Sequence, residues 1–327
     1  MAIRIGIYGY GNLGRGVESA IAQNADMTLV GVFTRRDPMS VKTLTGAPVY
    51  HTDAALSMRD LIDVMILCGG SATDLPVQTP ALAEHFNVVD SFDTHARIPE
   101  HLANVDAAAK RSGKAAIISV GWDPGLFSIA RAYAGAVLPE GEDYTFWGRG
   151  VSQGHSDAIR HIDGVLDARQ YTVPISDALA AARIGECHTL SPFEMHRREC
   201  YVAIADNADP ERIERSIKSM PDYFLGYDTA VTFLPASELE REHSKLPHAG
   251  SVITTAKTGI SRESAHTLEL SLKLDSNPEF TGAVLVCVAR AANIMAKNGE
   301  KGCKTPIDIP PVLYSPKKRD ELLHTLI

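Results

Sequence analysis

A glycine-rich turn near the start of the chain has the spacing of a phosphate-binding loop. Gly9-Tyr10-Gly11-Asn12-Leu13-Gly14 follows an apolar run that reads as a strand and opens a stretch with helical periodicity. In such a turn the first glycine permits the bend, the second lets a pyrophosphate approach the backbone, and the third lets helix and strand pack closely. Amide groups at the N-terminus of the helix favour anions. The motif predicts dinucleotide binding, and the alternative is a glycine-rich surface turn.

The end of the second expected strand indicates which dinucleotide binds. About 20 residues beyond the loop, an NAD-binding domain normally carries Asp or Glu to hold the ribose 2′-hydroxyl. This chain has Thr34-Arg35-Arg36 there. Two guanidinium groups and a hydroxyl suit a 2′-phosphate, which a carboxylate would repel. We therefore expect NADP as the cofactor, against the alternative of two solvated arginines.

Three polar segments follow later strands of the same region. They are Cys68-Gly69-Gly70-Ser71-Ala72-Thr73, Ser91-Phe92-Asp93-Thr94-His95 and Gly121-Trp122-Asp123-Pro124-Gly125. Residues at such positions face the crevice where ligands of open α/β sheets bind. We expect the first segment (Cys68, Gly69, Gly70, Ser71 and Thr73) to border the nicotinamide ribose. Asp93 and Asp123 could hold a substrate ammonium and orient its carbon. The alternatives are an ordinary strand-to-helix turn for the first segment and turn formation for an Asp before Pro-Gly.

These segments need a parallel sheet to bring them together, and the first third of the chain has its pattern. Short apolar runs alternate with helical stretches, which is typical of βαβ units. We expect helices at 12–25 and 99–112, the second ended by Gly113. The expected strands are Ile3–Tyr8, Leu29–Phe33, Val64–Cys68, Asn87–Asp90 and Ala115–Val120.

The rhythm changes after Gly121, where strands predominate. A helix is expected after Pro210, and a long, largely apolar helix at 281–297, closed by Asn298-Gly299, should return to pack on the first domain. The strand-like segments are Thr145–Trp147, Arg169–Val173, Cys200–Ala205, Ala230–Leu234, Ser251–Thr255 and Thr267–Leu274. The prediction is an α/β protein, with an N-terminal Rossmann-type parallel sheet and a C-terminal α+β domain of mostly antiparallel sheet with helices on one face. Residues 1–122 form the dinucleotide-binding domain, rejoined by 278–327, and 123–277 form a substrate-binding and dimerisation domain.

Bulk composition narrows the class of protein. The 327 residues exceed what one core comfortably serves, and the net charge of −8 argues against nucleic-acid or membrane partners. The N-terminal residues enter a strand without a signal-peptide pattern. Cys68, Cys187, Cys200, Cys287 and Cys303 include no Cys-x-x-Cys, which predicts free thiols in a reducing cytoplasm and no metal site.

Seven segments together resemble the meso-diaminopimelate dehydrogenase family. They recur in the family's order from the first strand to about residue 295, and the Gly-Trp-Asp-Pro-Gly and Gln-Gly-His-Ser-Asp segments are the most distinctive. The segments are 9–15, 121–125, Phe146-Trp147-Gly148, Gln153-Gly154-His155-Ser156-Asp157, Met220-Pro221-Asp222-Tyr223-Phe224, Leu246-Pro247-His248 and 272–278. Residues 304–327 and the two glycines after Cys68 match the family least well.

The resemblance implies a reaction and a residue for each part of a substrate. The reaction is reversible, NADP-dependent oxidative deamination of the D-centre of meso-2,6-diaminopimelate to L-2-amino-6-oxopimelate and ammonia, in lysine biosynthesis, by a cytoplasmic homodimer. The pocket would lie between the two domains, with Asp93 and Asp123 at the D-centre amine. The other implied roles are Trp122 and Trp147 lining the pocket, Gln153, Gly154 and His155 at the D-centre carboxylate, Thr172, Arg198 and His248 at the L-centre carboxylate, and Asn277 near the distal amine.

Other interpretations stay open at this point. Trp122 and Trp147 could be core residues, Arg198 could lie on a solvated face, and His155, His248 and Thr172 could be structural. The chain could also be another two-domain NADP reductase, similar to dihydrodipicolinate reductase or to sugar oxidoreductases. A semialdehyde dehydrogenase fits less well, because no catalytic cysteine stands out. A non-catalytic NADP sensor would need the glycine loop and Arg35-Arg36 but no Arg, His and Thr cluster in a second domain.

Overall fold

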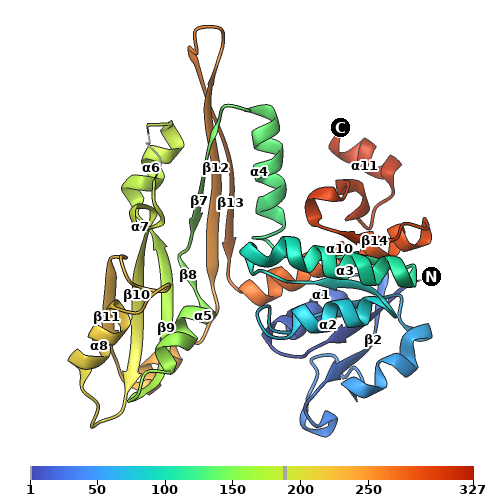
Figure 1. Cartoon of the computed structure of the whole chain (residues 1–327), viewed down its shortest axis with the longest axis horizontal. Coiled ribbons are helices and arrows are strands. Elements are labelled where there is room, and N and C mark those ends of the chain that lie inside the picture. Colours follow the sequence, from blue (N-terminus) through green and yellow to red (C-terminus); the bar gives the residue numbers. More distant parts are fainter. Residues whose placement is uncertain (1, 187–189) are drawn as a thin grey trace. The chain divides into compact units, whose positions relative to one another are not determined.

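The chain folds into two compact units (Figure 1). The computed structural model describes residues 2–186 and 190–327, so Cys187, one of the predicted thiols, lies outside the described residues. Unit 1 consists of Met1–Ile129 and Pro278–Ile327, and unit 2 of Ala130–Asn277. The return of the chain falls at the expected residue 278, whereas the first crossing falls after 129 rather than after 122.

Unit 1 is built on a seven-stranded sheet with the order β14-β6-β5-β4-β1-β2-β3. Every neighbouring pair is parallel, and this is the strand order of doubly wound dinucleotide-binding domains, extended by β14. The central strands read as continuous apolar runs because both faces of the sheet are covered. The strands are β1 Ile3–Tyr8, β2 Met27–Thr34, β3 Val49–His51, β4 Val64–Leu67, β5 Asn87–Asp90, β6 Ala115–Ile117 and β14 Gly302–Lys304.

Helices cover the two faces of this sheet. One apolar cluster joins the sheet to α1 (Asn12–Ala22) and α10 (Asn277–Lys297), and the other joins it to α2 (Leu75–Ala83) and α3 (Ile98–Ser112). As expected, α3 ends at Gly113, which has a φ of 70°. Two further helices are α4 (Leu126–Val137), where the chain leaves unit 1, and α11 (Arg319–Leu326).

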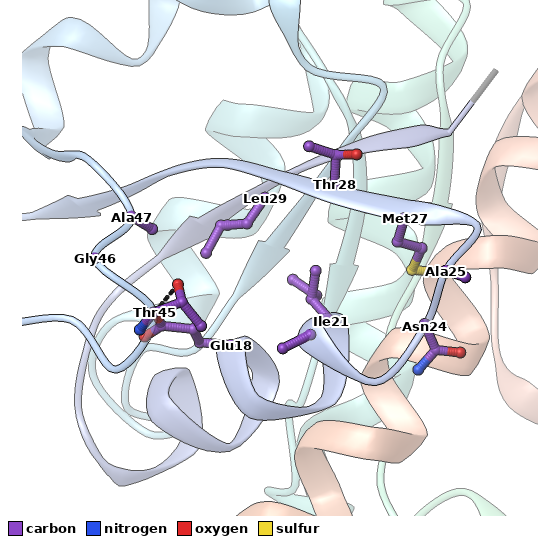
Figure 2. Close-up of a pocket in the computed structure, with 11 residues that line it drawn as sticks. Glu18, Ile21, Asn24, Ala25, Met27, Thr28, Leu29, Thr45, Gly46 and Ala47 are labelled. Atoms are coloured by element: carbon purple, nitrogen blue, oxygen red, sulfur yellow. Dashed lines mark hydrogen bonds between the residues drawn. The ribbon is translucent and has the colours of Figure 1, made fainter.

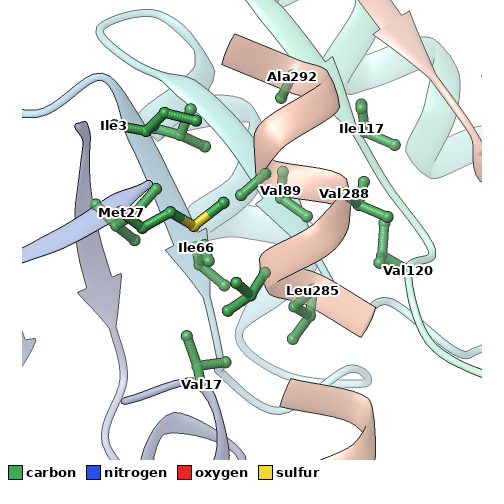
Figure 3. Packing of buried hydrophobic residues seen from close by; sticks show 14 of the residues in the cluster. Ile3, Val17, Met27, Ile66, Val89, Ile117, Val120, Leu285, Val288 and Ala292 are labelled. Atoms are coloured by element: carbon green, nitrogen blue, oxygen red, sulfur yellow. The ribbon is translucent and has the colours of Figure 1, made fainter. Parts of the chain in front are cut away.

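Helix α10 confirms the expectation of a buried apolar helix that returns to the first domain. It is long and apolar enough to span a membrane by length and composition, but its apolar side chains are buried in the core of unit 1. Figure 3 shows Leu285, Val288 and Ala292 among side chains of the sheet. Its approach to α1 is close: a Cβ on Gly282 would lie 2.4 Å from the Gly16 carbonyl carbon, and one on Gly16 would lie 2.2 Å from the Pro278 oxygen.

Unit 2 contains two sheets, where the sequence predicted one. The four-stranded sheet has the order β11-β10-β9-β8, and the three-stranded sheet has the order β13-β12-β7. All pairs are antiparallel except β10 with β11. The strands are β7 Glu142–Trp147, β8 Gly150–Val151, β9 Val165–Pro174, β10 His196–Ile204, β11 Thr229–Phe233, β12 His248–Thr258 and β13 Ser264–Leu274. The helices are α5 Gln153–Arg160, α6 Ser176–Ile184, α7 Pro192–Met195, α8 Pro210–Lys218 and α9 Ala236–His243.

Two elements of unit 1 end three residues earlier than expected. Helix α1 ends at Ala22 instead of Ala25, because the Asn24 side chain donates to the Ala20 carbonyl at 2.8 Å and competes with further helical turns. Strand β6 ends at Ile117 instead of Val120, because Ser119 has a φ of 57° and its amide turns inward to the Asp90 carboxylate.

Candidate functional site

The glycine loop has the geometry that a bound pyrophosphate requires. Gly9 has a φ of 96°, and a Cβ on Gly14 would lie 2.5 Å from the Gly9 oxygen, so both positions need glycine. Nothing lies within 4 Å of the place of a Cβ on Gly11, which leaves open space beside the backbone. Helix α1 begins there with no side chain capping its first amides. These amides are available to an anion, with Asn12 and Leu13 in the first turn.

Tyr10 can contribute to this loop through its backbone alone. Its side chain is buried, and its phenol donates to the Glu18 carboxylate. Burial and Glu18 raise the pKa of Tyr10 to about 12. Glu18 also accepts from the Thr45 amide at 2.7 Å, so this pair fixes the loop after β2 to α1.

The residues predicted to bind the 2′-phosphate of NADP lie at the end of β2. Thr34 is buried, and its Oγ1 accepts from the Arg36 amide at 3.2 Å. The Arg36 guanidinium donates to the Tyr10 carbonyl and so reaches the glycine loop. Arg35 pairs with Asp74 at 3.0 Å and keeps 69% of its side chain exposed. Two cations therefore stand beside the glycine loop, where a 2′-phosphate could reach them.

The Cys68–Thr73 segment follows β4 and lies against the glycine loop. The position of a Cβ on Gly9 is 3.1 Å from the Cys68 carbonyl carbon. The Gly70 amide donates to Asp74 at 3.0 Å, and Asp74 in turn pairs with Arg35. Burial raises the pKa of the Cys68 thiol, which keeps it protonated and a poor nucleophile.

The loop after β5 meets this segment directly. The Asp93 amide donates to Ser71 Oγ at 2.8 Å, and Ser71 Oγ lies 3.2 Å from Thr94 Oγ1. The Asp93 side chain is exposed. It is one of the two carboxylates that were expected to hold the substrate ammonium. Asp123 lies in the loop after β6, which the sequence placed at the same edge of the sheet.

The loop that carries Asp123 is tightly closed. A Cβ on Gly125, which has a φ of 125°, would lie 2.0 Å from the Gly121 oxygen. Trp122 is only 7% exposed and packs edge-on against Phe127 at 5.3 Å. Much of the Trp122 surface is therefore part of the core of unit 1, as the alternative interpretation held.

A hollow elsewhere in unit 1 adjoins Glu18, the partner of the Tyr10 phenol. It is lined by parts of α1, β2 and the loop at 45–47, and the carboxylate of Glu18 at its wall is already bonded to Thr45 (Figure 2). None of the predicted cofactor residues lines it.

In unit 2, strand pairing places two predicted site residues, Thr172 and Arg198, in one row with Gly150. Gly150 of β8 is opposite Thr172 of β9, and Thr172 is opposite Arg198 of β10. His248, at the start of β12, packs its ring on Gly150, where a Cβ would lie 2.4 Å from the His248 Cγ. Strand pairing brings Thr172 beside Arg198, and the packing of His248 from the three-stranded sheet on Gly150 adds His248 to the same place.

Arg198 is a buried cation in this row. It is 8% exposed, so it does not belong to a solvated face. Its guanidinium donates to Thr172 Oγ1 and lies over the Tyr227 ring, 4.0 Å from the centroid. Among residues 2–186 and 190–327, no carboxylate pairs with it, and its Nε is buried without a hydrogen-bond partner. A buried cation of this kind is suited to bind an anion.

His155 and His248 are both neutral near pH 7. Burial, with Arg198 adding to it, lowers the pKa of His155 to about 4, and burial lowers the pKa of His248. A neutral imidazole can still donate one hydrogen bond from one ring nitrogen. His155 Nδ1 lies 2.7 Å from Ser152 Oγ at the N-terminus of α5, and its buried Nε2 has no hydrogen-bond partner among the residues that the structure describes.

The remaining predicted residues surround this row or lie at its ends. Trp147 stacks on His196 at 5.4 Å, and its amide donates to His196 Nε2 at 2.9 Å. Gln153 and Gly154 are exposed in the first turn of α5. The Asn277 amide donates to the Leu246 carbonyl at 2.9 Å, which ties it to the segment before His248.

Comparison with known proteins decides the family. The family described as "Diaminopimelic acid dehydrogenase C-terminal domain" matches residues 121–276. A meso-diaminopimelate D-dehydrogenase from Acetivibrio thermocellus is 56% identical over 326 residues, which cover 99% of this chain and 98% of the relative. The chain belongs to the meso-diaminopimelate D-dehydrogenase family.

Solved structures agree with this membership. The Corynebacterium glutamicum diaminopimelate dehydrogenase in complex with DAP aligns with a TM-score of 0.92 at 46% identity, covering 99% of each chain. An engineered D-amino acid dehydrogenase bound to NADP⁺ aligns with a TM-score of 0.88 at 45% identity, covering 100% of each chain. The rival assignments to other NADP reductases or to a sensor are therefore not retained for this member of the meso-diaminopimelate D-dehydrogenase family.

Three residues of the site were missed by the sequence analysis. The Tyr227 ring stacks on Arg198. Gln170 is buried beside Thr172, and its Oε1 has no hydrogen-bond partner in the described part of the chain. Asp90 bonds the two loops that carry Asp93 and Asp123. Gln170 and Thr172 share a strand face by the two-residue period, so Gln170 could have been noticed. Tyr227 lies in a loop, and no periodic signal marks it.

Proposed function

We propose that this protein catalyses the reversible, NADP-dependent oxidative deamination of the D-centre of meso-2,6-diaminopimelate. The products of the forward reaction are L-2-amino-6-oxopimelate, ammonia and NADPH. Family membership over the full chain supports the reaction. The observation that carries the substrate class is Arg198, a buried guanidinium that lacks a carboxylate partner in the described chain and therefore suits a dicarboxylic substrate.

The residues of unit 1 fit NADP. The amides at the start of α1 and the open space at Gly11 suit the pyrophosphate, and Arg35 and Arg36 suit the 2′-phosphate. The Cys68–Thr73 segment would border the nicotinamide ribose through its backbone and hydroxyls. When bound, NADP⁺ would supply the acceptor for the hydride that leaves the D-centre carbon of the substrate.

The residues of unit 2 hold the end of the substrate that does not react and the carboxylate of the D-centre. Arg198 binds the L-centre carboxylate with Thr172 and the neutral His248, and Asn277 lies at the distal amine. Gln153 and Gly154 offer backbone amides at the start of α5 to the D-centre carboxylate. The unpartnered Nε2 of His155 supplies one further neutral hydrogen-bonding group there.

Asp93 and Asp123 hold and orient the D-centre amine. After loss of the hydride, the D-centre is an imine, and Trp122 and Trp147 limit the access of solvent to it. Water adds to the imine carbon, a proton moves to nitrogen, and the carbon–nitrogen bond breaks to release ammonia. An aspartate beside the nitrogen can take and return that proton.

The assembly and location of the enzyme are part of the same proposal. The family resemblance supports a homodimer with unit 2 as the dimerisation domain, and sedimentation of the purified enzyme would test it. Cys68, Cys200, Cys287 and Cys303 are free, which supports a reducing cytoplasm.

The decisive experiment compares three stereoisomers. NADPH formation is followed at equal concentrations of the pure meso-, LL- and DD-diaminopimelates. The meso-isomer should react rapidly and the LL-isomer negligibly, since it has no D-centre. The DD-isomer should be poor, because its distal end mismatches the Arg198 site and lost positioning can cost about 100-fold. Equal turnover of the LL- and meso-isomers would refute the proposal.

A further inference from the structure

Asp90 is a carboxylate that the proposed mechanism does not use. It is the last residue of β5 and is 0% exposed. Burying a carboxylate is unfavourable unless its oxygens are bonded, so its partners indicate why it is there. They come from four segments of unit 1, namely the loops after β5 and β6 and the helices α2 and α3.

One oxygen of Asp90 bonds the two loops that carry the predicted carboxylates. Oδ1 accepts from the Phe92 amide at 3.1 Å and from the Ser119 amide at 3.0 Å. Phe92 immediately precedes Asp93. Ser119 has a left-handed φ of 57°, which is unfavourable for an L-residue and must be held by its surroundings. The Val120 amide also donates to the Asp90 carbonyl at 2.9 Å, so the start of the Asp123 loop is fixed twice.

The other oxygen of Asp90 is fixed by two helices. Oδ2 accepts from Thr79 Oγ1 of α2 at 2.7 Å and lies 2.7 Å from His101 Nε2 of α3. The His101 ring stacks on Phe92 with centroids 4.2 Å apart, which adds a second contact to the same loop. The carboxylate can therefore neither rotate nor withdraw without breaking bonds to both helices.

We propose that Asp90 is a positioning residue, which holds the loops after β5 and β6 so that Asp93 and Asp123 are placed for the D-centre amine. This inference rests on the proposed function. The same network reaches the cofactor side, because the Asp93 amide is bonded to Ser71 of the third loop. A small displacement of these loops would misplace the carbon that reacts while leaving the Arg198 site intact.

Two substitutions at Asp90 test the proposal by the size of the loss. Asp90→Asn keeps the volume and one acceptor oxygen for the two amides, and we expect kcat to fall by about tenfold. Asp90→Ala removes the acceptor, and we expect kcat to fall about 100-fold or more, the scale for misplaced reacting groups. The KM for meso-diaminopimelate should change less than kcat, because the distal site is untouched. NADP affinity, titrated by fluorescence, should stay within about threefold.

A matched control separates positioning from stability. Asp26 is a carboxylate of the same unit that pairs with Arg290 at 2.6 Å and touches none of the three loops. Asp26→Asn should lower the melting temperature and leave kcat unchanged. If Asp90→Ala behaves in that way, with a lower melting temperature and normal kcat, the proposal is overturned. If Asp90→Ala does not fold, Asp90→Asn decides: a lower kcat at a near-normal melting temperature supports the proposal, and a normal kcat refutes it.

A readout without turnover keeps the result independent of the proposed reaction. The sequence has two tryptophans, so Trp147→Phe leaves Trp122, which lies in the loop held by Asp90. Acrylamide should quench Trp122 more strongly when Asp90→Asn or Asp90→Ala is added, because the loop is released. Unchanged quenching would refute the role of Asp90, whereas a wild-type enzyme that fails to reduce NADP with meso-diaminopimelate would refute the proposed function instead.

Discussion

At the scale of single residues, Arg198 carries most of the argument for a dicarboxylic substrate. A guanidinium that is 8% exposed loses most of its hydration, and burial lowers its pKa from the ordinary value without removing its charge. The Thr172 hydroxyl and the Tyr227 ring face compensate part of this loss. A substrate carboxylate would compensate the remaining loss of hydration, so we expect the carboxylate to bind strongly to Arg198.

Truncating Arg198 should therefore weaken use of the substrate and leave the cofactor alone. Arg198→Ala is expected to lower kcat/KM by an amount that corresponds to a loss of about 2–5 kcal/mol of transition-state stabilisation. This is the scale for removing one partner of a buried charge pair. Arg197→Ala is the control, since Arg197 is 51% exposed and pairs with Glu199 at the surface. Steady-state kinetics and NADP titration measure both effects. A large loss of NADP affinity in Arg198→Ala would reassign this residue to the cofactor.

Arg35 and Arg36 should decide the choice of cofactor. Replacing both by Ala removes the cations beside Thr34 and should raise the KM for NADP by about 10–100-fold, as for one or two charge-assisted hydrogen bonds. The KM for NAD should change much less, because NAD has no 2′-phosphate. Arg59→Ala, an exposed arginine that pairs with Asp60, serves as the control. An equal rise in the KM values for NADP and NAD would show that Arg35 and Arg36 do not bind the 2′-phosphate.

At the scale of elements, glycines of α1 do two different tasks. Gly11 precedes the helix and leaves open space, whereas Gly16 is buried against the start of α10. The close crossing of α1 with α10 places the returning helix over the sheet, where Leu285 and Val288 enter the core (Figure 3). Backbone-to-backbone contact of this kind tolerates no Cβ on either side.

Alanine at Gly16 should lower the stability of the protein, whereas alanine at Gly11 should lower its affinity for NADP. Gly16→Ala should lower the free energy of unfolding by about 1–3 kcal/mol or more, since the clash is with backbone and cannot relax by a rotamer change. Gly11→Ala should change stability by less than about 1 kcal/mol, because its φ of −102° suits alanine, yet NADP affinity should fall. Urea unfolding without cofactor and NADP titration test the pair. Loss of stability in Gly11→Ala would contradict the assignment of that open space to a ligand.

The sequence predicted the elements whose signal is local. The apolar runs of β1 and β5 and the caps of α3 and α8 are written in consecutive residues, and these elements lie where they were expected. The three-residue strands β3 and β14 and the two-residue β8 are too short for periodicity, and pairing with neighbours alone makes them strands. The division of unit 2 into two sheets also depends on non-local pairing.

The same distinction applies to the site. The glycine loop and Thr34-Arg35-Arg36 could be predicted because spacing along the chain sets their function. Arg198 could be chosen by resemblance, but its burial could not, since it follows from the row Gly150, Thr172 and Arg198 across three strands. Asp90 was predicted only as the end of a strand, and its role depends on partners from four segments.

At the scale of the whole molecule, the two units should differ in their response to acid. Among the described residues, the four histidines whose pKa is lowered by burial (His155, His196, His243 and His248) all lie in unit 2. A lowered pKa means that the unfolded state binds more protons, so the stabilisation is complete above the ordinary value of 6.5 and is lost as the pH falls. In unit 1, hydrogen bonds from Arg290 and Arg4 hold the pKa values of Asp26 and Asp63 below their usual 3.8, and that stabilisation is lost only below about pH 4.

Unit 2 should therefore lose stability first as the pH falls from 6.5 towards 4. His155 and His196 each have a pKa of about 4, so each can add a slope of up to about 1.4 kcal/mol per pH unit in that window. Trp122 lies in unit 1 and Trp147 in unit 2, and the chain has two tryptophans in all, so Trp122→Phe and Trp147→Phe variants report each unit separately. Urea unfolding followed by fluorescence at pH 7.5, 6, 5 and 4.5 should show the Trp147 transition moving to lower urea before the Trp122 transition does. Adding His155→Gln should flatten the pH dependence of the Trp147 transition, because one of the protons is no longer taken up. If the Trp122 transition moved first, or if His155→Gln left the slope unchanged, the buried neutral histidines would not be what limits the acid stability of unit 2.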